Sequence, residues 1–362
     1  MASSTAPADW FSRLFGFREG AYAATRERLA LEGDELVSRV NGARYATGRL
    51  EVVSLAALRE RTPLPPAGSP VRQTVQCVAA DARALHAVPE NAGALFQVAS
   101  QFNLLEMVGP DVSPEDGVTR YQHDRTQGPA CAMAAGAATV YRNYFAPVPG
   151  APGASEQRGQ TTTRQIDTLA PLGTALAAAL HRATGREPPA LWTMRNGYAL
   201  CRAEGLAVLN PWLRSAPETE RDALRAALCI GLHHGVEVTD LPDPPRPRVT
   251  QAYCSALPVA YGRGPTAAWE PLARLVLEAA YEATLRAALA QQQASGSGRV
   301  LLTRLGGGAF GNDAAWIDSA MERALALTAG TGLQVLLVSY GSVPASMAAL
   351  AARAQTQAPG PR

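Results

Sequence analysis

The apolar positions along the chain follow strand-like and helix-like patterns in turn from about residue 71 onward. Short apolar runs bounded by glycine, proline or polar residues are typical of buried strands, and they occupy 71–81, 94–100, 249–261, 299–305 and 333–341. Longer segments with helical spacing lie between or beside them, at 129–144, 172–184, 218–234, 270–293 and 313–329. This alternation predicts an α/β fold of three layers, α/β/α, in which helices cover both faces of a central mixed sheet.

Three stretches rich in proline or glycine divide the chain, at 62–70, 146–165 and 240–248. They suggest an N-terminal accessory segment over 1–70 and a main domain over 71–345. An inserted α+β segment is expected at about 146–248, and a flexible tail over 346–362. Within the insertion, the sequence Arg195-Asn196-Gly197-Tyr198 is typical of a hairpin turn, which could cover a pocket. We expect His233 and His234 to lie at a helix end.

Composition and charge indicate which kinds of binding partner the protein is not expected to have. The 33 basic residues, all arginine, nearly balance 31 acidic ones, so no strong attraction to nucleic acid or an acidic membrane is expected. The five cysteines lie far apart in apolar surroundings, which is not the spacing of a disulfide framework or a zinc site. Because no signal peptide or membrane-length apolar run is present, we expect a cytoplasmic protein without a bound metal. Its oligomeric state stays open.

The segment after the apolar run 299–305 is the most informative one. It consists of Gly306, Gly307, Gly308, Ala309, Phe310, Gly311 and Asn312, with a helix expected to start near residue 313. Glycines leave backbone N–H groups unshielded, and a turn of this kind ahead of a helix can hold a phosphate or diphosphate. Phe310 could cover a sugar or a ring. A tight turn with glycines that serve only packing is an equally good interpretation of this segment alone.

A second segment joins the strand that ends near Asn103 to a helix that starts at Gln127 and Gly128, just before Pro129. Proline in a first helical turn leaves backbone N–H groups open to a ligand. Carboxylates are crowded into the intervening loop, at Glu106, Glu115, Asp116 and Asp124. For each of them singly, a solvated loop residue is the simpler interpretation. As a group at the carboxyl ends of strands, they favour a ligand site.

Together these segments resemble the macrodomain family, which binds ADP-ribose or hydrolyses ADP-ribosyl groups. The resemblance implies that Asp81 binds the adenine and that Asn103 reaches the distal ribose. It places a first diphosphate loop at 124–129 and a second one at 308–311. It covers 71–145 and 249–340, so the chain is similar to a divergent branch with a large insertion. The usual Asn-Ala-Ala-Asn and the Gln-Glu-Glu of poly(ADP-ribose) glycohydrolases are absent from the sequence.

This resemblance implies an ADP-ribosyl hydrolase that removes ADP-ribose from a modified protein side chain, through an O-glycosidic or ester linkage that includes Ser or Thr. Such a glycosidic hydrolase needs an acid for the leaving group or an activated water, and no cofactor beyond ADP-ribose as ligand or product. The candidate catalytic residues are Glu115, Asp116, Asp124 and Glu106. Thr119 is a candidate contact to the acceptor. The alternative is a non-catalytic ADP-ribose reader.

Overall fold

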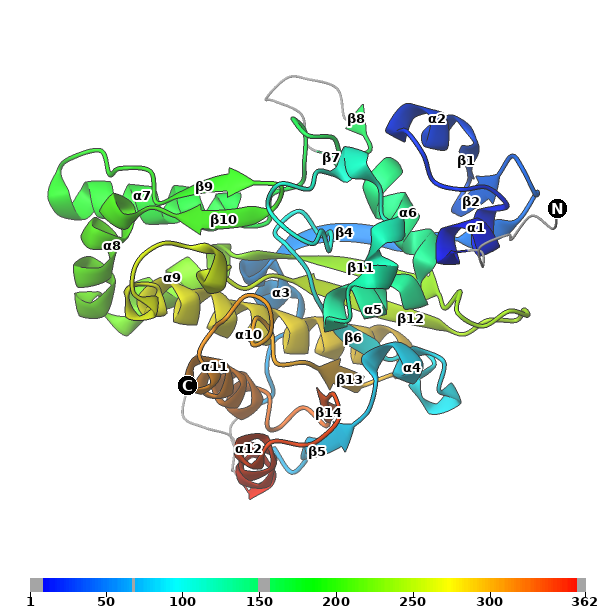
Figure 1. Cartoon of the computed structure of the whole chain (residues 1–362). Helices are drawn as coiled ribbons and strands as arrows, with labels where there is room; N and C mark the ends of the chain where they lie inside the picture. The colour runs from blue at the N-terminus through cyan, green and yellow to red at the C-terminus, as the bar shows by residue number, and fades with distance from the viewer. Residues whose placement is uncertain (1–8, 67–68, 149–156, 357–362) are drawn as a thin grey trace.

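A central sheet of seven strands organises the chain, in a computed structural model that describes residues 9–66, 69–148 and 157–356 (Figure 1). In spatial order the strands are β4 (Arg49–Ser54), β11 (Cys229–Glu237), β12 (Arg248–Cys254), β6 (Leu95–Ala99), β13 (Arg299–Leu302), β14 (Gln334–Ser339) and β5 (Thr74–Ala79). The five strands from β12 to β5 pair in parallel, whereas β11 is antiparallel to both of its neighbours. The sheet is therefore mixed, as expected.

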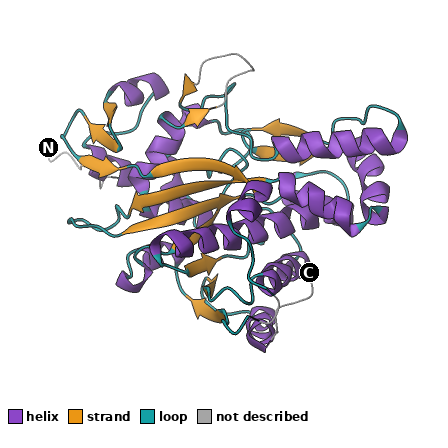
Figure 2. Cartoon of the chain, turned by 180° about the vertical axis from the view of Figure 1, so that it is seen from behind, coloured by secondary structure: helices purple, strands orange, loops and turns teal. Residues whose placement is uncertain are grey.

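Helices cover both faces of this sheet (Figure 2). One face packs on the long helix α10 (Glu270–Ser295), which α11 (Ala314–Leu327) and α3 (Leu55–Arg61) contact from outside. The other face packs on α4 (Ala82–His86), α5 (Gln127–Ala134) and α6 (Gly136–Tyr144). Strand β6 shows why both faces need cover: Leu95 belongs to the core on the α10 side and Phe96 to the core on the α5 side. The expected three-layer α/β/α fold is confirmed.

Further elements, which are not part of this sheet, lie toward the two ends of its strands (Figure 1). At one end lie α7 (Ala170–Thr184), α8 (Ala203–Ser215), α9 (Glu218–Ala227) and the hairpin of β9 (Trp192–Arg195) and β10 (Tyr198–Cys201). At the other end lie α1 (Trp10–Phe15), α2 (Tyr22–Glu27), β1 (Leu29–Glu32), β2 (Glu35–Ser38) and β3 (Arg44–Ala46). The short pair β7 (Pro147–Val148) and β8 (Gln157–Arg158) completes the set with α12 (Ala345–Thr356). The aromatic side chains of α1 pack against α6 in a core of their own.

The domain boundaries expected from the sequence do not coincide with the edges of the sheet. Strand β4 belongs to the segment 1–70, and it pairs with β11, which belongs to the segment 146–248. Both segments therefore supply strands to the central sheet. The helix expected over 218–234 is also wrong in its second half, because α9 ends at Ala227 and β11 begins at Cys229. His233 and His234 consequently lie in a strand and not at a helix end.

The expected flexible tail is a helix over most of its length. Helix α12 buries Met347 and Leu350, and the side-chain amide of Gln355 donates to the carbonyl oxygen of Val75 in β5 at 2.5 Å. Apolar residues at helical spacing in 345–356 explain why this segment packs on the body of the protein. Residues 357–362 lie outside the described part of the chain, as do 149–156 of the surface excursion expected at 146–165.

Candidate functional site

A two-part cavity lies at the carboxyl ends of β6, β12 and β13, where open α/β sheets bind ligands. The inner hollow has a volume of about 280 Å³, and Glu106, Tyr198 and Phe310 are on its wall. The outer hollow has a volume of about 580 Å³, and Asp81 and Gly307 are on its wall. The two hollows share the residues Asp124, Arg125, Gln127, Thr303, Arg304, Gly308 and Tyr340. Their sizes are in the range of small-molecule sites.

The glycine turn between β13 and α11 forms one wall of both hollows. Gly306 has φ 74°, and a Cβ on it would lie 2.5 Å from the Cβ of Ala256. The turn is closed by Asn312, whose backbone N–H donates to the carbonyl oxygen of Gly306 at 3.0 Å and whose amide donates to that of Leu257 at 2.8 Å. A Cβ at Gly308 would meet no heavy atom within 4 Å. The turn is therefore braced from behind, and its backbone is open toward the cavity at Gly308.

Not every residue of the expected loop is on the cavity wall. Gly306, Gly308, Ala309 and Phe310 line the inner hollow, and Gly307 lines the outer one. Asn312 is buried and serves the turn itself. Gly311 has φ 69° and packs against Ala260, whose backbone N–H donates to the carbonyl oxygen of Phe310. These last two residues therefore shape the loop and do not face the hollow.

Three aromatic rings close one end of the inner hollow. The rings of Tyr198, Tyr261 and Phe310 have centroids 5.1 to 5.9 Å apart and meet at tilted or edge-on angles. Tyr198 comes from the β9–β10 hairpin, and its hydroxyl donates to the carbonyl oxygen of Met107 at 2.7 Å. The hairpin turn expected at 195–198 is confirmed, with positive φ at Asn196 and Gly197. Tyr261 lines the inner hollow as well.

The start of α5 forms the opposite wall. The side chain of Gln127 accepts a hydrogen bond from the backbone N–H of Ala99 at 2.9 Å and donates to the carbonyl oxygen of Gln97 at 2.8 Å, which joins the helix to the end of β6. A Cβ on Gly128 would lie 2.0 Å from the carbonyl oxygen of Ala99, so only glycine allows this approach. The N-cap residue Thr126 makes no capping bond with its side chain. The first N–H groups of the helix are left without an intrahelical acceptor.

Glu106 is the buried carboxyl group of the cavity. It is 2% exposed, and it lies on the wall of the inner hollow. Its backbone N–H donates to the hydroxyl of Tyr121 at 2.9 Å, and Nη2 of Arg142 lies 3.4 Å from both carboxylate oxygens. Burial raises the pKa of Glu106 to about 7, because the loss of hydration outweighs the nearby Arg142 cation and the Tyr121 hydroxyl. A carboxyl group with this pKa can hold a proton at neutral pH.

Asp124 and Asp81 are the other acidic residues at the cavity. Asp124 lines both hollows, and its Oδ1 atom accepts hydrogen bonds from the backbone N–H and the hydroxyl of Thr126 at 2.8 and 2.7 Å. Asp81 lines the outer hollow and caps α4 through the backbone N–H of Arg83 at 2.7 Å. In each carboxylate, the Oδ1 atom therefore accepts a hydrogen bond from a backbone N–H group two residues later.

The side chains of Glu115 and Asp116 are engaged away from the walls of both hollows. Glu115 accepts hydrogen bonds from the hydroxyl and, at 2.9 Å, the backbone N–H of Thr162, and these bonds lower its pKa. Asp116 accepts from the backbone N–H of Ser113 at 2.8 Å and closes a capping box. Both carboxylates serve their own loops.

Asn103 and Thr119 also serve the protein framework. The fully buried amide of Asn103 donates to Gln165 at 2.8 Å and accepts from the backbone N–H of Leu105 at 3.1 Å. The backbone N–H of Thr119 donates to the carboxylate of Glu19 at 2.6 Å, which anchors the loop to the N-terminal segment. Neither residue is on the wall of the inner or the outer hollow.

Several wall residues carried no functional expectation at the level of sequence. They are Ser100, Gln101, Thr303, Arg304 and Tyr340. Thr303 and Arg304 directly precede the glycine turn, so their place in the chain was a usable signal. Tyr340 follows β14 and is 84% exposed at the mouth of both hollows. An aromatic residue at the carboxyl end of a parallel strand was the corresponding signal there.

No model of a known protein family matches the chain, and no curated protein matches its sequence. Among solved structures, the chain is similar to a poly(ADP-ribose) glycohydrolase from Thermomonospora curvata bound to the inhibitor ADP-HPD. The identity is 14% and the TM-score 0.42, over 92% of this chain and 97% of that one. It is also similar to a poly(ADP-ribose) glycohydrolase from Deinococcus radiodurans in complex with ADP-ribose, with 13% identity and a TM-score of 0.38 over 84% and 93%. These identities are too low to transfer residue roles, which have to come from the cavity itself.

The described residues contain neither a membrane-spanning helix nor a cluster of metal-ligating side chains. None of the helices over 9–66, 69–148 and 157–356 is long and apolar enough to cross a membrane. Within the same residues, three or more histidine, cysteine or acidic side chains do not meet in a group that could hold a metal ion.

Proposed function

We propose that the two-part cavity binds an ADP-ribosyl group and that the chain is a hydrolase which removes this group from a modified protein side chain, with Glu106 as the proton donor. The observation that carries the proposal is the place of Glu106: a buried carboxyl group with a pKa of about 7, on the wall opposite an open glycine turn. The proposed reaction uses water and needs no cofactor.

The shape of the cavity supports a ligand with a diphosphate in its middle. The open backbone at Gly308 and the first N–H groups of α5 border the region that the two hollows share, and both are suited to phosphate oxygens. Arg125 adds a cation at the same place. Asp81 in the outer hollow is suited to accept a hydrogen bond from an adenine amino group. The ribose to be cleaved would then occupy the inner hollow, beside Glu106.

The proposed chemistry breaks the bond between C1″ of the distal ribose and the oxygen of the acceptor side chain. Glu106 gives its proton to that oxygen as the bond breaks, and water then adds to C1″ of the oxocarbenium-like ribose and loses a proton to the Glu106 carboxylate, which restores the acid. An acid with a pKa near the working pH is the most effective donor, which is the state that burial creates at Glu106. In O-glycosidic linkages to Ser or Thr and in esters of Asp or Glu, the leaving group is an oxygen atom of the acceptor side chain. Both linkages fit this step.

Binding and cleavage can be tested separately. We expect calorimetry to show that the chain binds ADP-ribose with a Kd in the micromolar range or below, and that Glu106→Gln binds it with similar affinity. The same variant should lower the release of label from ADP-ribosylated protein by ~10²-fold or more, because an amide cannot donate the proton. Absence of binding at millimolar ADP-ribose would overturn the whole proposal. Full activity of Glu106→Gln would overturn the role of Glu106.

A non-catalytic ADP-ribose reader is the second candidate, and one observation favours it. Two of the four carboxylates expected to be catalytic, Glu115 and Asp116, make their contacts within loops and leave the cavity with fewer acids. A reader would bind ADP-ribose in the same hollows without releasing it from any linkage. Incubation with Ser-, Thr-, Arg- and Asp/Glu-linked substrates distinguishes the two candidates, since only the hydrolase releases label.

A further inference from the structure

A completely buried arginine lies behind Glu106. Arg142 is on α6 and has 0% exposure. Buried arginines are rare in proteins unless they are paired, because the loss of hydration is costly. The Nη2 atom of Arg142 lies 3.4 Å from both carboxylate oxygens of Glu106. The fold therefore places a cation, whose burial costs hydration free energy, beside the buried carboxyl group on the wall of the inner hollow.

Arg142 also holds the backbone that leads to Glu106. Its Nε atom donates to the carbonyl oxygen of Leu104 at 3.0 Å, and its Nη2 atom donates to the hydroxyl of Thr139 at 3.1 Å. Leu104 has φ 64°, a left-handed conformation that is unfavourable for a leucine. Such strain persists only where the surroundings hold it. One guanidinium group thus contacts both the strained residue and the carboxyl group two residues later.

An aromatic ring fixes the plane of this guanidinium. The Cζ atom of Arg142 lies 3.8 Å from the ring centroid of Tyr253 in β12, which is close for a cation–π contact. The hydroxyl of Tyr253 donates to Oε1 of Gln251 at 2.5 Å, so the ring is itself held. The amide of Gln251 in turn donates to the carbonyl oxygen of Cys131 in α5 at 2.9 Å. Arg142 is therefore positioned by both β12 and α6.

The pair between Arg142 and Glu106 is longer than a strong ion pair. Charge-assisted bonds between arginine and carboxylate are about 2.7–2.9 Å long and often bidentate, whereas here a single nitrogen lies at 3.4 Å. The Nη1 atom of Arg142 has no hydrogen-bond partner among the residues that the structure describes. A shorter, bidentate pair would favour the ionised carboxylate much more strongly. The observed geometry holds the carboxyl group in place and leaves it able to carry a proton.

Four buried titratable groups that interact with Glu106 or Arg142 are neutral, whereas Arg120 and Asp124 line a small hollow with Glu106 without contacting its carboxyl group. The four neutral groups are Tyr121 from the loop before α5, Cys131 from α5, Tyr253 from β12 and His233 from β11. Burial raises the pKa of Tyr121, Cys131 and Tyr253 well above their ordinary values, and it lowers the pKa of His233 well below its own. Arg142 is thus the charged partner in contact with Glu106.

We propose that Arg142 is a positioning residue, which holds the carboxyl group of Glu106 at the wall of the inner hollow and restrains the strained turn at Leu104 without itself reaching the ligand. It lines neither hollow, so its effect on a reaction passes through Glu106. This inference rests on the proposed role of Glu106 as proton donor.

The test compares Arg142→Met with Arg142→Lys, and it follows Glu106 directly. The carboxyl signal of Glu106 in ¹³C-labelled protein can be assigned by its loss in Glu106→Gln and then titrated. We expect the pKa of Glu106 to rise by ~1 unit or more in Arg142→Met, because a cation within hydrogen-bonding distance is removed. We expect a smaller rise in Arg142→Lys, which keeps the charge but not the planar contacts.

Turnover gives a second readout. For a proton donor, activity falls as pH rises through its pKa, so the alkaline limb of the kcat profile should move to higher pH in Arg142→Met. At the same time kcat should fall ~10-fold or more from the lost positioning, with little change in the affinity for ADP-ribose. A purely structural loss would lower kcat without moving the limb.

The outcomes separate this inference from the proposed function. An unchanged titration of Glu106 in Arg142→Met overturns the positioning role, whether or not the protein hydrolyses anything. If the pKa of Glu106 shifts in Arg142→Met but the wild type has no hydrolase activity, the proposed function is overturned. The interaction between Arg142 and Glu106 is then still supported. If Arg142→Met does not fold, Tyr253→Leu replaces it, since it removes the ring that fixes the guanidinium. A shift in the same direction is then expected, and no shift contradicts the inference.

Discussion

Gly306 and Gly308 lie in the same turn but in different surroundings. Gly306 has a positive φ, and a Cβ on it would lie 2.5 Å from the Cβ of Ala256. We expect Gly306→Ala to lower the free energy of unfolding by ~1–3 kcal/mol, through left-handed strain and crowding. Gly308→Ala should change it by less than ~0.5 kcal/mol, because its Cβ would project into open space.

Chemical denaturation of the two variants beside the wild type measures this difference. Equal losses of stability in Gly306→Ala and Gly308→Ala would show that the turn is restrained in another way. If Gly308→Ala keeps its stability but loses affinity for ADP-ribose, the backbone at Gly308 lies against the ligand, as the proposed diphosphate position requires.

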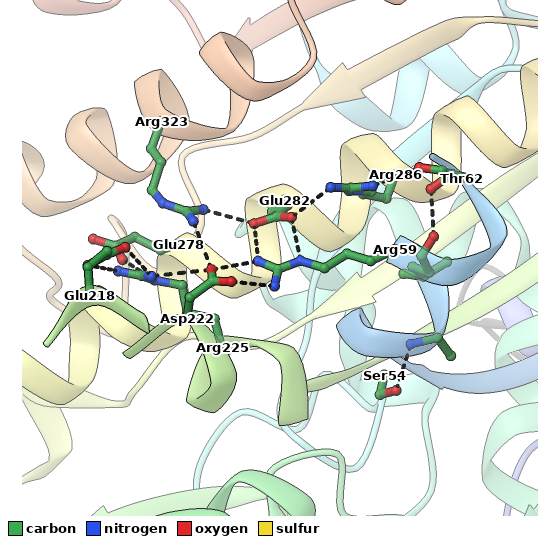
Figure 3. Close-up of polar contacts among 12 residues, drawn as sticks. Ser54, Arg59, Thr62, Glu218, Asp222, Arg225, Glu278, Glu282, Arg286 and Arg323 are labelled. Atoms are coloured by element: carbon green, nitrogen blue, oxygen red, sulfur yellow. Dashed lines mark hydrogen bonds and ion pairs between the residues drawn. The ribbon is translucent and has the colours of Figure 1, made fainter. Parts of the chain in front are cut away.

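At the scale of elements, a network of charged side chains joins four helices on the α10 side of the sheet (Figure 3). The carboxylate of Glu282 in α10 accepts hydrogen bonds from Arg59 of α3 at 2.7 Å and from Arg323 of α11 at 2.9 Å. Asp222 of α9 accepts from Arg59 at 2.7 Å and from Arg323 at 3.2 Å. Burial alone would raise the pKa of Glu282, but the hydrogen bonds from Arg59 and Arg323 outweigh it, so the pKa is lowered.

The network predicts a strong and local dependence of stability on Glu282, whose side chain is 1% exposed. We expect Glu282→Gln to lower the free energy of unfolding by ~3–5 kcal/mol, because it removes the buried anion from among partly buried arginines and leaves Arg59 and Arg323 with Asp222 alone. The control is Arg353→Ala, which removes an exposed ion pair with Glu322 and should leave the stability nearly unchanged, because solvent screens such pairs. Thermal and chemical denaturation measure both. A loss in Glu282→Gln no larger than in the control would mean that solvent already screens the network.

At the scale of the whole molecule, Glu106 makes stability depend on pH. Its pKa is about 7 in the folded protein and ~4.3 in an unfolded chain, so the folded state holds this proton more tightly. Stability falls with rising pH wherever the folded state binds more protons, so this contribution is lost between about pH 4.3 and pH 7. The loss amounts to about 4 kcal/mol, at ~1.36 kcal/mol for each unit of pKa difference.

Unfolding free energies of the wild type and Glu106→Gln, measured from pH 4 to pH 8.5, test this contribution. The difference between the two proteins isolates Glu106 from the other titrating groups. We expect the wild type to lose stability relative to Glu106→Gln as pH rises through this window, and to run parallel to it above pH 8. A difference that stays constant across the window would mean that Glu106 has the same pKa in the folded and the unfolded chain.

The fold was largely predictable because its strands and helices follow clean periods, and the failures have physical causes. Leu228, Ile230 and Leu232 alternate as in a strand, but they follow directly on an alanine-rich helix without a glycine or proline between. The sequence pattern therefore predicts a helix that continues to residue 234, where the structure has most of strand β11. The strand β4 was placed in an accessory segment because pairing with β11 is a long-range contact that local patterns do not encode.

The site was predictable where geometry depends on glycine and uncertain where it depends on short polar side chains. The turn at 306–310 and the helix start at Gln127 lie on the cavity wall. These positions were predictable because their backbone conformation and close packing require glycine. Asn103, Asp116 and Glu115 could bind either a ligand or the backbone of their own loops, and the sequence does not distinguish the two. In the structure their side chains are taken up by the loops.

The two edge strands of the sheet come from neighbouring parts of the chain, and this has a consequence for synthesis. β4 and β5 are joined by α3 and the stretch that follows it, yet they pair with residues 229–234 and 334–339. On the ribosome both edges emerge early, but β4 finds its partner only after residue 234 and β5 only after residue 339 of the 362-residue chain. Contacts this distant in sequence slow folding and leave strands open to wrong pairing in the meantime. A nascent chain that stops before β14 would carry β5 as an unpaired strand, which is a natural target for chaperones.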